Sequence, residues 1–215
     1  MLGCSIALSM LLCGGSALYF CLFRNNIRPE RSEYLYVPTG CDYEGLLCLL
    51  DSTQMLRNRQ SFQLVARLRK LPGHLRPGRY ALPFGTSNYE LTSKLRSGNQ
   101  EAVSLRFNNI RTLEQLAARV SQQLEMDSST LMQWLKKDSL LTAYGVDTTT
   151  VICLFIPNTY ECWWTTSAPD FIARMQHEYT VFWNSRRLEK AKEMGMTPFQ
   201  VMTLASIVEE ENFRQ

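Results

Sequence analysis

Residues 78–98, GRYALPFGTSNYELTSKLRSG, show in one stretch how this chain is built. Gly78–Leu82 is typical of a short β-strand, and the segment 85–87 after it is typical of a turn that ends in a helix cap. Tyr89–Leu95 has the spacing of an amphipathic helix, and Gly98 supplies a stop. The stretch therefore predicts a strand, a polar cap and a helix in that order.

The same order of elements occurs before and after that stretch. Tyr34–Pro38 is an extended run followed by the helical pattern Tyr43–Leu50, and Val103–Phe107 alternates before the helical pattern Leu113–Val120. Each helix would bury an apolar stripe against a small sheet, which is the arrangement of an α+β module. Residues that can cap a helix stand near the three expected helix starts, at Thr39, Ser87 and Thr112.

Further elements are expected on both sides of these units. The patterns of residues 61–71 and 128–137 predict two more helices. Val151–Ile156 is a continuous apolar run and predicts a strand, and Ser167 opens a long helix with an apolar stripe. The predicted fold class is therefore α+β.

An aromatic cluster, Tyr160, Trp163 and Trp164, follows the expected strand. Aromatic faces can stack on sugar rings, because they offer flat apolar area with a polar rim. Packing in a core is the alternative, and it is favoured for aromatic residues without a known pocket.

Composition excludes several classes of function. The 215 residues are 45% hydrophobic and 20% charged, which is ordinary for a globular protein, and the net charge of +3 does not favour nucleic acid. His74 and His177 stand apart, and the seven cysteines lack metal-type spacing, so no metal and no cofactor is expected. Cys41 and Cys48 could pair in an oxidising compartment, although their spacing does not require it.

The first 23 residues contain no charged side chain and predict a transmembrane anchor, which residues 24–33 join to the rest as a polar linker. Arg24, Arg28 and Arg31 follow the apolar run, and the positive-inside rule alone would place the bulk of the chain in the cytoplasm. A cleaved signal peptide and a lipid-modified Cys13 are less favoured alternatives.

Residues 197–212 predict a capped helix near the end of the chain. Thr197 suits the N-cap, Pro198 suits the first helical position, and Gln200 completes a capping box. The apolar residues that follow have helical spacing and form one face: Val201, Leu204, Ile207 and Val208.

One of three adjacent glutamates in this helix lies close to that apolar face. At about 100° per residue, Glu211 lies roughly 40° from the centre of the face, whereas Glu209 and Glu210 lie more than about 100° away. A carboxyl in an apolar pocket has a raised pKa and can act as a general acid near neutral pH. A solvated acidic helix end is the alternative, since most charge runs are solvated.

Two motifs resemble the MltG (YceG-like) family of endolytic murein transglycosylases: Phe155–Tyr160 (FIPNTY) and, after a helical stretch, Leu204–Glu211 (LASIVEEE). The run Leu75–Tyr80, with the segment 91–98 after it, resembles the LysM-like subdomain of that family. The resemblance implies a LysM-like subdomain at 34–102 and a mixed α+β catalytic domain from residue 103 to residue 215. It also implies that the catalytic domain is truncated at its C-terminus.

The resemblance further implies the residues of a site. Glu211 matches the catalytic acid of the family, Glu209 matches a supporting carboxylate, and Asn158 and Tyr160 belong to the motif that would bind substrate. The implied reaction cleaves the β-1,4 bond between N-acetylmuramic acid and N-acetylglucosamine and leaves a 1,6-anhydro end. Where the family commonly has Glu-Gly before the first motif, this chain has Ile152-Cys153.

The implied partners are peptidoglycan glycan strands and membrane-embedded cell-wall synthases. The implied location is the bacterial inner membrane, with a single membrane pass and the bulk of the chain on the periplasmic side. A membrane-tethered scaffold that binds glycan without catalysis is the alternative function. An intramembrane or cytoplasmic protein is a third, which the arginines after the anchor favour.

Overall fold

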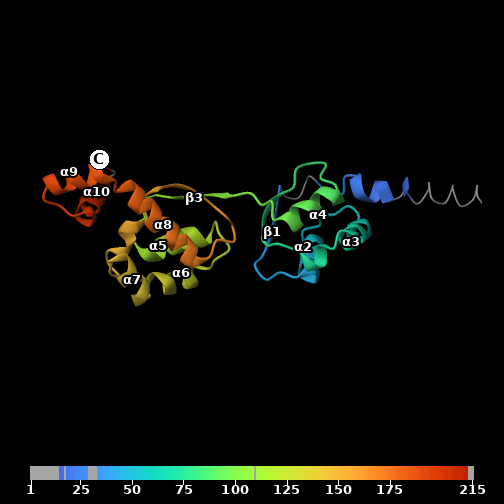
Figure 1. Cartoon of the computed structure of the whole chain (residues 1–215), viewed down its shortest axis with the longest axis horizontal. Coiled ribbons are helices and arrows are strands. Elements are labelled where there is room, and N and C mark those ends of the chain that lie inside the picture. Colours follow the sequence, from blue (N-terminus) through green and yellow to red (C-terminus); the bar gives the residue numbers. More distant parts are fainter. Residues whose placement is uncertain (1–14, 17, 29–32, 109, 213–215) are drawn as a thin grey trace, which may run out of the picture. The chain divides into compact units, whose positions relative to one another are not determined.

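The structure is a computed structural model that describes residues 15–16, 18–28, 33–108 and 110–212. The chain divides into two compact units (Figure 1). The first comprises the residues up to Ala102 together with Trp163–Thr165, and the second comprises Val103–Cys162 and the residues from Thr166. Each unit holds one antiparallel pair of strands with helices, so the predicted α+β class is confirmed.

In the first unit, β1 (Tyr34–Val37) pairs with β2 (Gly78–Ala81), with Leu35 opposite Tyr80. The helices of this unit are α2 (Tyr43–Ser52), α3 (Arg59–Leu68), the short 3₁₀ helix η1 (Leu71–Gly73) and α4 (Asn88–Ser97). Residues 15–16 and 18–23, before β1, are also helical. The strands and helices therefore follow the order that the sequence predicts.

The predicted cap of α4 is confirmed. The Ser87 hydroxyl accepts a hydrogen bond from the Glu90 backbone N–H, and the Glu90 carboxylate accepts one from the Ser87 N–H. At the other end Gly98 has a φ of 71°, a left-handed conformation that glycine adopts without strain. Leu91 and Leu95, one turn apart on α4, are fully buried in the core of the first unit.

Residues 24–28 differ from the polar linker that the sequence predicts for 24–33. Ile27 is only 1% exposed and lies in the core of the first unit, and Asn26 beside it is also buried. The Asn26 amide donates to Asn58 O and to Asn88 Oδ1, and its own Oδ1 accepts from the Asn58 N–H. These hydrogen bonds allow the polar side chain to be buried, so this segment is part of the unit.

In the second unit, β3 (Val103–Phe107) pairs with β4 (Asn158–Cys162), with Leu105 opposite Tyr160. The remaining elements of this unit are, in chain order, α5 (Leu113–Ser121), α6 (Ser128–Leu135), α7 (Asp138–Tyr144), the 3₁₀ helix η2 (Val151–Leu154), α8 (Ala168–Phe182), α9 (Ser185–Glu193) and α10 (Pro198–Asn212). The sequence does not predict α7 or α9.

The predicted strand at 151–156 is wrong. Residues 151–154 form η2, and the strand that pairs with β3 begins only at Asn158. The Asp147 carboxylate organises the turn before η2, because it accepts hydrogen bonds from the Thr149 hydroxyl and from the backbone N–H of Thr150. Those bonds, the Thr149 hydroxyl first, lower the pKa of Asp147 to about 2.

Among the described residues, no helix combines the length and apolar character needed to cross a bilayer. Residues 1–14 and 17 of the predicted anchor lie outside the described residues. The anchor therefore stays a prediction.

Candidate functional site

The helix that carries Glu211 begins as predicted. The Thr197 hydroxyl accepts a hydrogen bond from the Gln200 N–H at 3.3 Å, and the Gln200 side chain accepts one from the Thr197 N–H at 2.8 Å. The first turn of α10 also contacts α8, where the rings of Phe199 and Tyr179 stack with centroids 5.9 Å apart. The start of α10 is thus fixed both by its cap and by an aromatic contact.

The rest of α10 differs from the expectation. The predicted apolar face is largely exposed, with Leu204 41%, Ile207 54% and Val208 52% exposed. Glu211 is also exposed, so the burial that an acid in an apolar pocket requires is not present among the described residues. The side chain of Glu209 lies outside what the structure describes.

Tyr160 is a core residue. It is only 4% exposed, its ring stacks on Phe107 with centroids 5.4 Å apart, and its hydroxyl donates to Ile156 O at 2.6 Å. Burial raises the pKa of Tyr160 to about 12. Because both the ring and the hydroxyl have partners inside the protein, this geometry fits the core-packing alternative and not sugar stacking.

Asn158, at the start of the same strand, is exposed. It stands opposite Phe107 at the start of β4, and its side-chain oxygen accepts from the Thr159 N–H. Three positions further along, the exposed Glu161 carboxylate accepts a hydrogen bond from the Ser104 hydroxyl at 2.7 Å. Thr159 and Glu161 therefore lie on the exposed face of β4, whereas Tyr160 and Cys162 lie on the face toward the core, which is also the face of Asn158.

The described residues do not bring the four predicted positions into mutual contact. Asn158 and Tyr160 are neighbours on β4, and α10 packs against η2, which directly precedes that strand. No hydrogen bond or ion pair joins α10 to β4 within the described part of the chain.

A cavity of about 560 Å³ lies in the second unit where β3 leads into α5. Its described lining residues are polar for the most part: Asn108, Ile110, Arg111, Gln115, Ala118, Arg119 and Gln122. Guanidinium and amide groups can donate hydrogen bonds to carboxylate or hydroxyl oxygens, but they supply no general acid near neutral pH. The cavity is thus suited to binding, and none of the four predicted site residues lines it.

The sequence contained a signal for this cavity. Gln115, Arg119 and Gln122 follow each other at helical spacing, on the face of α5 opposite the buried Leu116 and Val120. A polar stripe of this kind is common on solvated helices, which is why it does not single out a site.

Within residues 15–16, 18–28, 33–108 and 110–212, no group of three or more potential ligand residues could hold a metal ion. The described cysteines are all free thiols, and Cys41 and Cys48 are not bonded to each other. Burial first, and then the neighbouring Asp42 carboxylate, raises the pKa of the Cys41 thiol, which does not favour a thiolate nucleophile.

Comparison with known proteins identifies the family. The profile of the YceG-like family matches residues 35–215. The chain belongs to the YceG-like family. The resemblance to MltG that the sequence motifs suggested is therefore confirmed, and the family is associated with transglycosylase activity.

No curated protein matches this YceG-like chain. Among solved structures, it is similar to the crystal structure of a yceG-like protein from Listeria monocytogenes, with 20% sequence identity and a TM-score of 0.48. The match covers 83% of this chain and 64% of the Listeria chain. All four predicted site residues fall within the part that the YceG-like profile matches.

Proposed function

We propose that this YceG-like chain acts in endolytic cleavage of peptidoglycan glycan strands, with Glu211 as the catalytic acid and base. The observation that carries the proposal is the family match over residues 35–215, which includes the Ala205–Glu211 element on a capped helix. The proposed location is the inner membrane, with the chain anchored by its first 23 residues and facing the periplasm.

In the proposed reaction one carboxyl acts first as a general acid and then as a general base. Glu211 protonates the glycosidic oxygen between N-acetylmuramic acid and N-acetylglucosamine as the C1–O bond breaks. The resulting carboxylate then accepts the proton of the muramyl C6 hydroxyl, while that oxygen closes on C1 and forms the 1,6-anhydro ring. No water is consumed, and no second carboxylate at a fixed separation is needed, in contrast to two-carboxylate glycosidases.

The exposure of Glu211 bears on how this acid would work. An exposed carboxyl can be reached by a polymer, but it must keep its proton until the bond breaks. We infer that the glycan strand itself covers the carboxyl, because Ile207 and Val208 offer exposed apolar area near it in the helix. Desolvation by the bound sugar would favour the neutral form of the acid. Asn158 and Glu209 are the other positions proposed to contact substrate.

The test is the Glu211→Gln substitution, which keeps the shape of the side chain but removes the transferable proton. We expect it to abolish the formation of anhydro-ended glycans from sacculi, measured by chromatography of the digest, with circular dichroism unchanged. A general acid typically contributes about 10²–10⁴-fold in rate, so residual product should fall at least to that extent.

Glu210→Gln is the matched control. It removes the same carboxylate from the preceding position, which the helical wheel places more than about 100° from the apolar face. We expect Glu210→Gln to keep activity. Equal activity of Glu211→Gln and the unchanged protein would refute the assignment.

A second function is favoured by one observation, the exposure of Glu211 in the described structure. If the acidic end of α10 is only solvated, the chain would be a membrane-tethered protein that binds glycan without cleaving it. Binding of the protein to sacculi with no anhydro product would support this alternative over the enzyme.

A further inference from the structure

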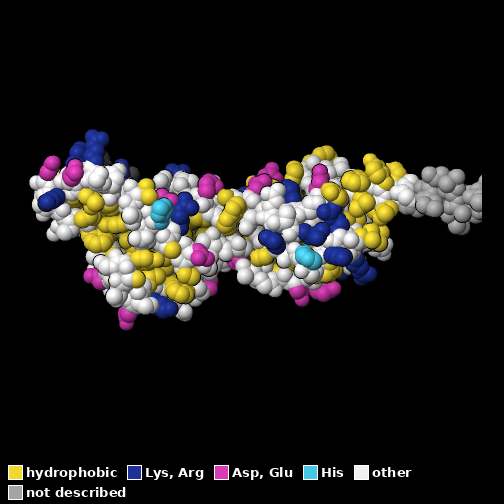
Figure 2. All heavy atoms as spheres, in the orientation of Figure 1, with side chains coloured by type: hydrophobic (Ala, Val, Ile, Leu, Met, Phe, Trp, Pro, Cys, Tyr) yellow, Lys and Arg dark blue, Asp and Glu magenta, His cyan; other side chains and the backbone are white. Residues whose placement is uncertain are grey.

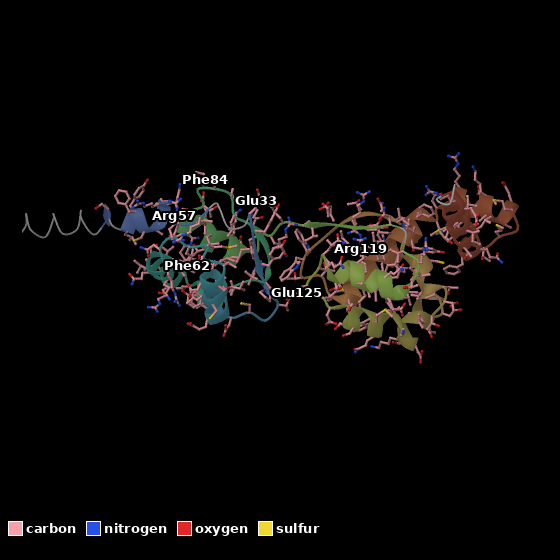
Figure 3. All side chains as sticks on the ribbon, turned by 180° about the vertical axis from the view of Figure 1, so that it is seen from behind. Glu33, Arg57, Phe62, Phe84, Arg119 and Glu125 are labelled. Atoms are coloured by element: carbon pink, nitrogen blue, oxygen red, sulfur yellow. The ribbon has the colours of Figure 1, made fainter. Side chains whose placement is uncertain are left out.

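One end of the first unit carries exposed aromatic side chains beside two exposed arginines. Residues 18–23 are helical and expose Leu18, Tyr19, Phe20 and Phe23, and the turn between β2 and α4 exposes Phe84 at 72%. Figure 2 shows hydrophobic side chains gathered at this end of the unit, with Lys and Arg side chains next to them. Figure 3 labels Phe84 and Arg57, which lie at the same end of the unit as the helix of residues 18–23.

The aromatic residues of that helix are in contact with α4. The ring of Phe23 lies 5.3 Å from that of Tyr89, and Tyr19 lies 5.0 Å from Phe23. The Asn88 amide donates to Cys21 O at 2.8 Å, and this hydrogen bond joins the backbone of the helix to the start of α4. Residues 18–23 are therefore packed against the first unit through contacts with the start of α4.

The turn that carries Phe84 is held to the residues that follow the helix. Asn25 forms a β-bridge with Ser87, and the backbone N–H groups of Asn26 and Ile27 donate to Thr86 O at 3.2 and 3.3 Å. Since Ile27 is anchored in the core, the position of Phe84 beside residues 18–25 is set by the fold.

A pocket of about 230 Å³ opens between this helix and the start of α3. Phe20, Arg24, Arg57 and Ser61 are among the residues that line it. Arg24 and Arg57 are both exposed, and within the described part of the chain neither forms an ion pair. By contrast, Arg59 on the same α3 is paired with Asp51 at 2.9 Å. Two unpaired guanidinium groups at a small polar pocket suit a phosphate group.

We propose that this end of the first unit docks on the bilayer surface, with Phe84 and the rings of residues 19–23 at headgroup level and Arg24 and Arg57 against lipid phosphates. The proposal rests on the proposed membrane anchor. Residues 1–23 contain no charge, and the described aromatic surface continues directly from that apolar segment. Aromatic rings are favoured at the membrane interface, and arginines at the surface of an anionic leaflet are attracted to it. The unit would then be held at a fixed height on the membrane.

The test uses the full chain reconstituted into vesicles of phosphatidylcholine and phosphatidylglycerol, with and without brominated acyl chains. Phe84→Trp adds a reporter to the four native tryptophans. Relative to the unchanged protein, we expect the added emission to shift to the blue on reconstitution and to be lost in brominated vesicles. Cys48→Trp is the matched control, because Cys48 is exposed on α2, which Figure 1 labels on the side of the unit away from the end where Figure 3 labels Phe84. Its emission should show neither change.

The arginines are tested in the same vesicles. In Phe84→Trp protein, Arg24→Gln with Arg57→Gln should lower the docking equilibrium by about five-fold per charge, so that quenching weakens and becomes insensitive to salt. Lys190→Gln with Lys192→Gln removes the same charge from exposed positions of α9 in the second unit and should leave quenching unchanged.

Each outcome tests one part of the proposal: the anchor, the docking or the contact with phosphate. If the full chain does not float with vesicles, both the anchor and the docking are overturned. If it floats but brominated acyl chains do not quench the Phe84→Trp emission, only the docking is overturned. If quenching occurs but the double arginine variant and the double lysine variant weaken it equally, the contact with phosphate is overturned. Competition of the quenching by soluble glycan fragments would assign the surface to glycan and overturn a lipid ligand.

Discussion

Tyr160 is a residue for which sugar binding and core packing predict different consequences of mutation. In the structure its hydroxyl donates to Ile156 O, so Tyr160→Phe should lower the free energy of unfolding by about 1 kcal/mol. Tyr160→Ala also removes the ring that stacks on Phe107 and should cost about 3–5 kcal/mol. Urea denaturation of the two variants measures both effects. Unchanged stability in Tyr160→Ala, together with loss of glycan binding, would contradict the core role.

Single residues were predicted well where the signal is local. Thr112, Ser87 and Ser167 each accept a hydrogen bond from the backbone N–H three residues on, as their positions before an apolar pattern predict. The exposure of Glu211 could not be predicted in the same way. A helical wheel gives the direction of a side chain, but it does not say which part of the chain covers that direction.

At the scale of elements, α10 gives a direct test of how a helix that exposes much of its apolar face is stabilised. Leu204, Ile207 and Val208 add little burial, so the capping box and the contact of Phe199 with Tyr179 must carry much of the stability. Thr197→Ala should therefore cost about 1 kcal/mol and increase amide hydrogen exchange along α10. Thr142→Ala, an exposed threonine within α7 that caps no helix, is the matched control. Unchanged exchange in α10 would contradict this account.

The elements that the sequence does not predict correctly are those in which the apolar pattern carries no clear period. Helix α9 buries only Ala191, so it lacks the apolar periodicity from which a helix is predicted, and Asn184 caps it instead. Residues 151–156 are apolar throughout, and such a run cannot distinguish a strand from another buried segment. In the structure the hydrogen bonds of Asp147 turn the chain just before η2, so residues 151–154 form a 3₁₀ helix and not a strand.

At the scale of the whole molecule, repeated strand-and-helix patterns predicted the α+β class, but they did not predict how the N-terminal segment joins the first unit. Polar composition and a proline suggested a linker, whereas Asn26 satisfies its hydrogen bonds inside the unit and Ile27 enters the core. A short polar segment with one apolar residue is ambiguous in sequence, because its partners, Asn58 and Asn88, lie far along the chain.

The pH dependence of stability should reflect both units. Burial raises the pKa of Tyr80 in the first unit, and of Tyr160 and Tyr179 in the second, to about 12. An unfolded tyrosine titrates near pH 10, so each folded tyrosine holds its proton more tightly than the unfolded chain does. The stability that these groups contribute is fully present below about pH 10 and is lost as the pH rises through about 12.

Thermal unfolding followed across this alkaline range should show a falling midpoint, together with tyrosinate absorbance that appears in two stages. Exposed tyrosines should ionise first, and Tyr80, Tyr160 and Tyr179 should ionise as the protein unfolds. Tyr80→Phe removes one of the three groups, so it should reduce the slope of stability against pH while Tyr160 and Tyr179 still contribute. A single ionisation step near pH 10, with no change in the unfolding midpoint, would contradict the raised pKa of these three tyrosines.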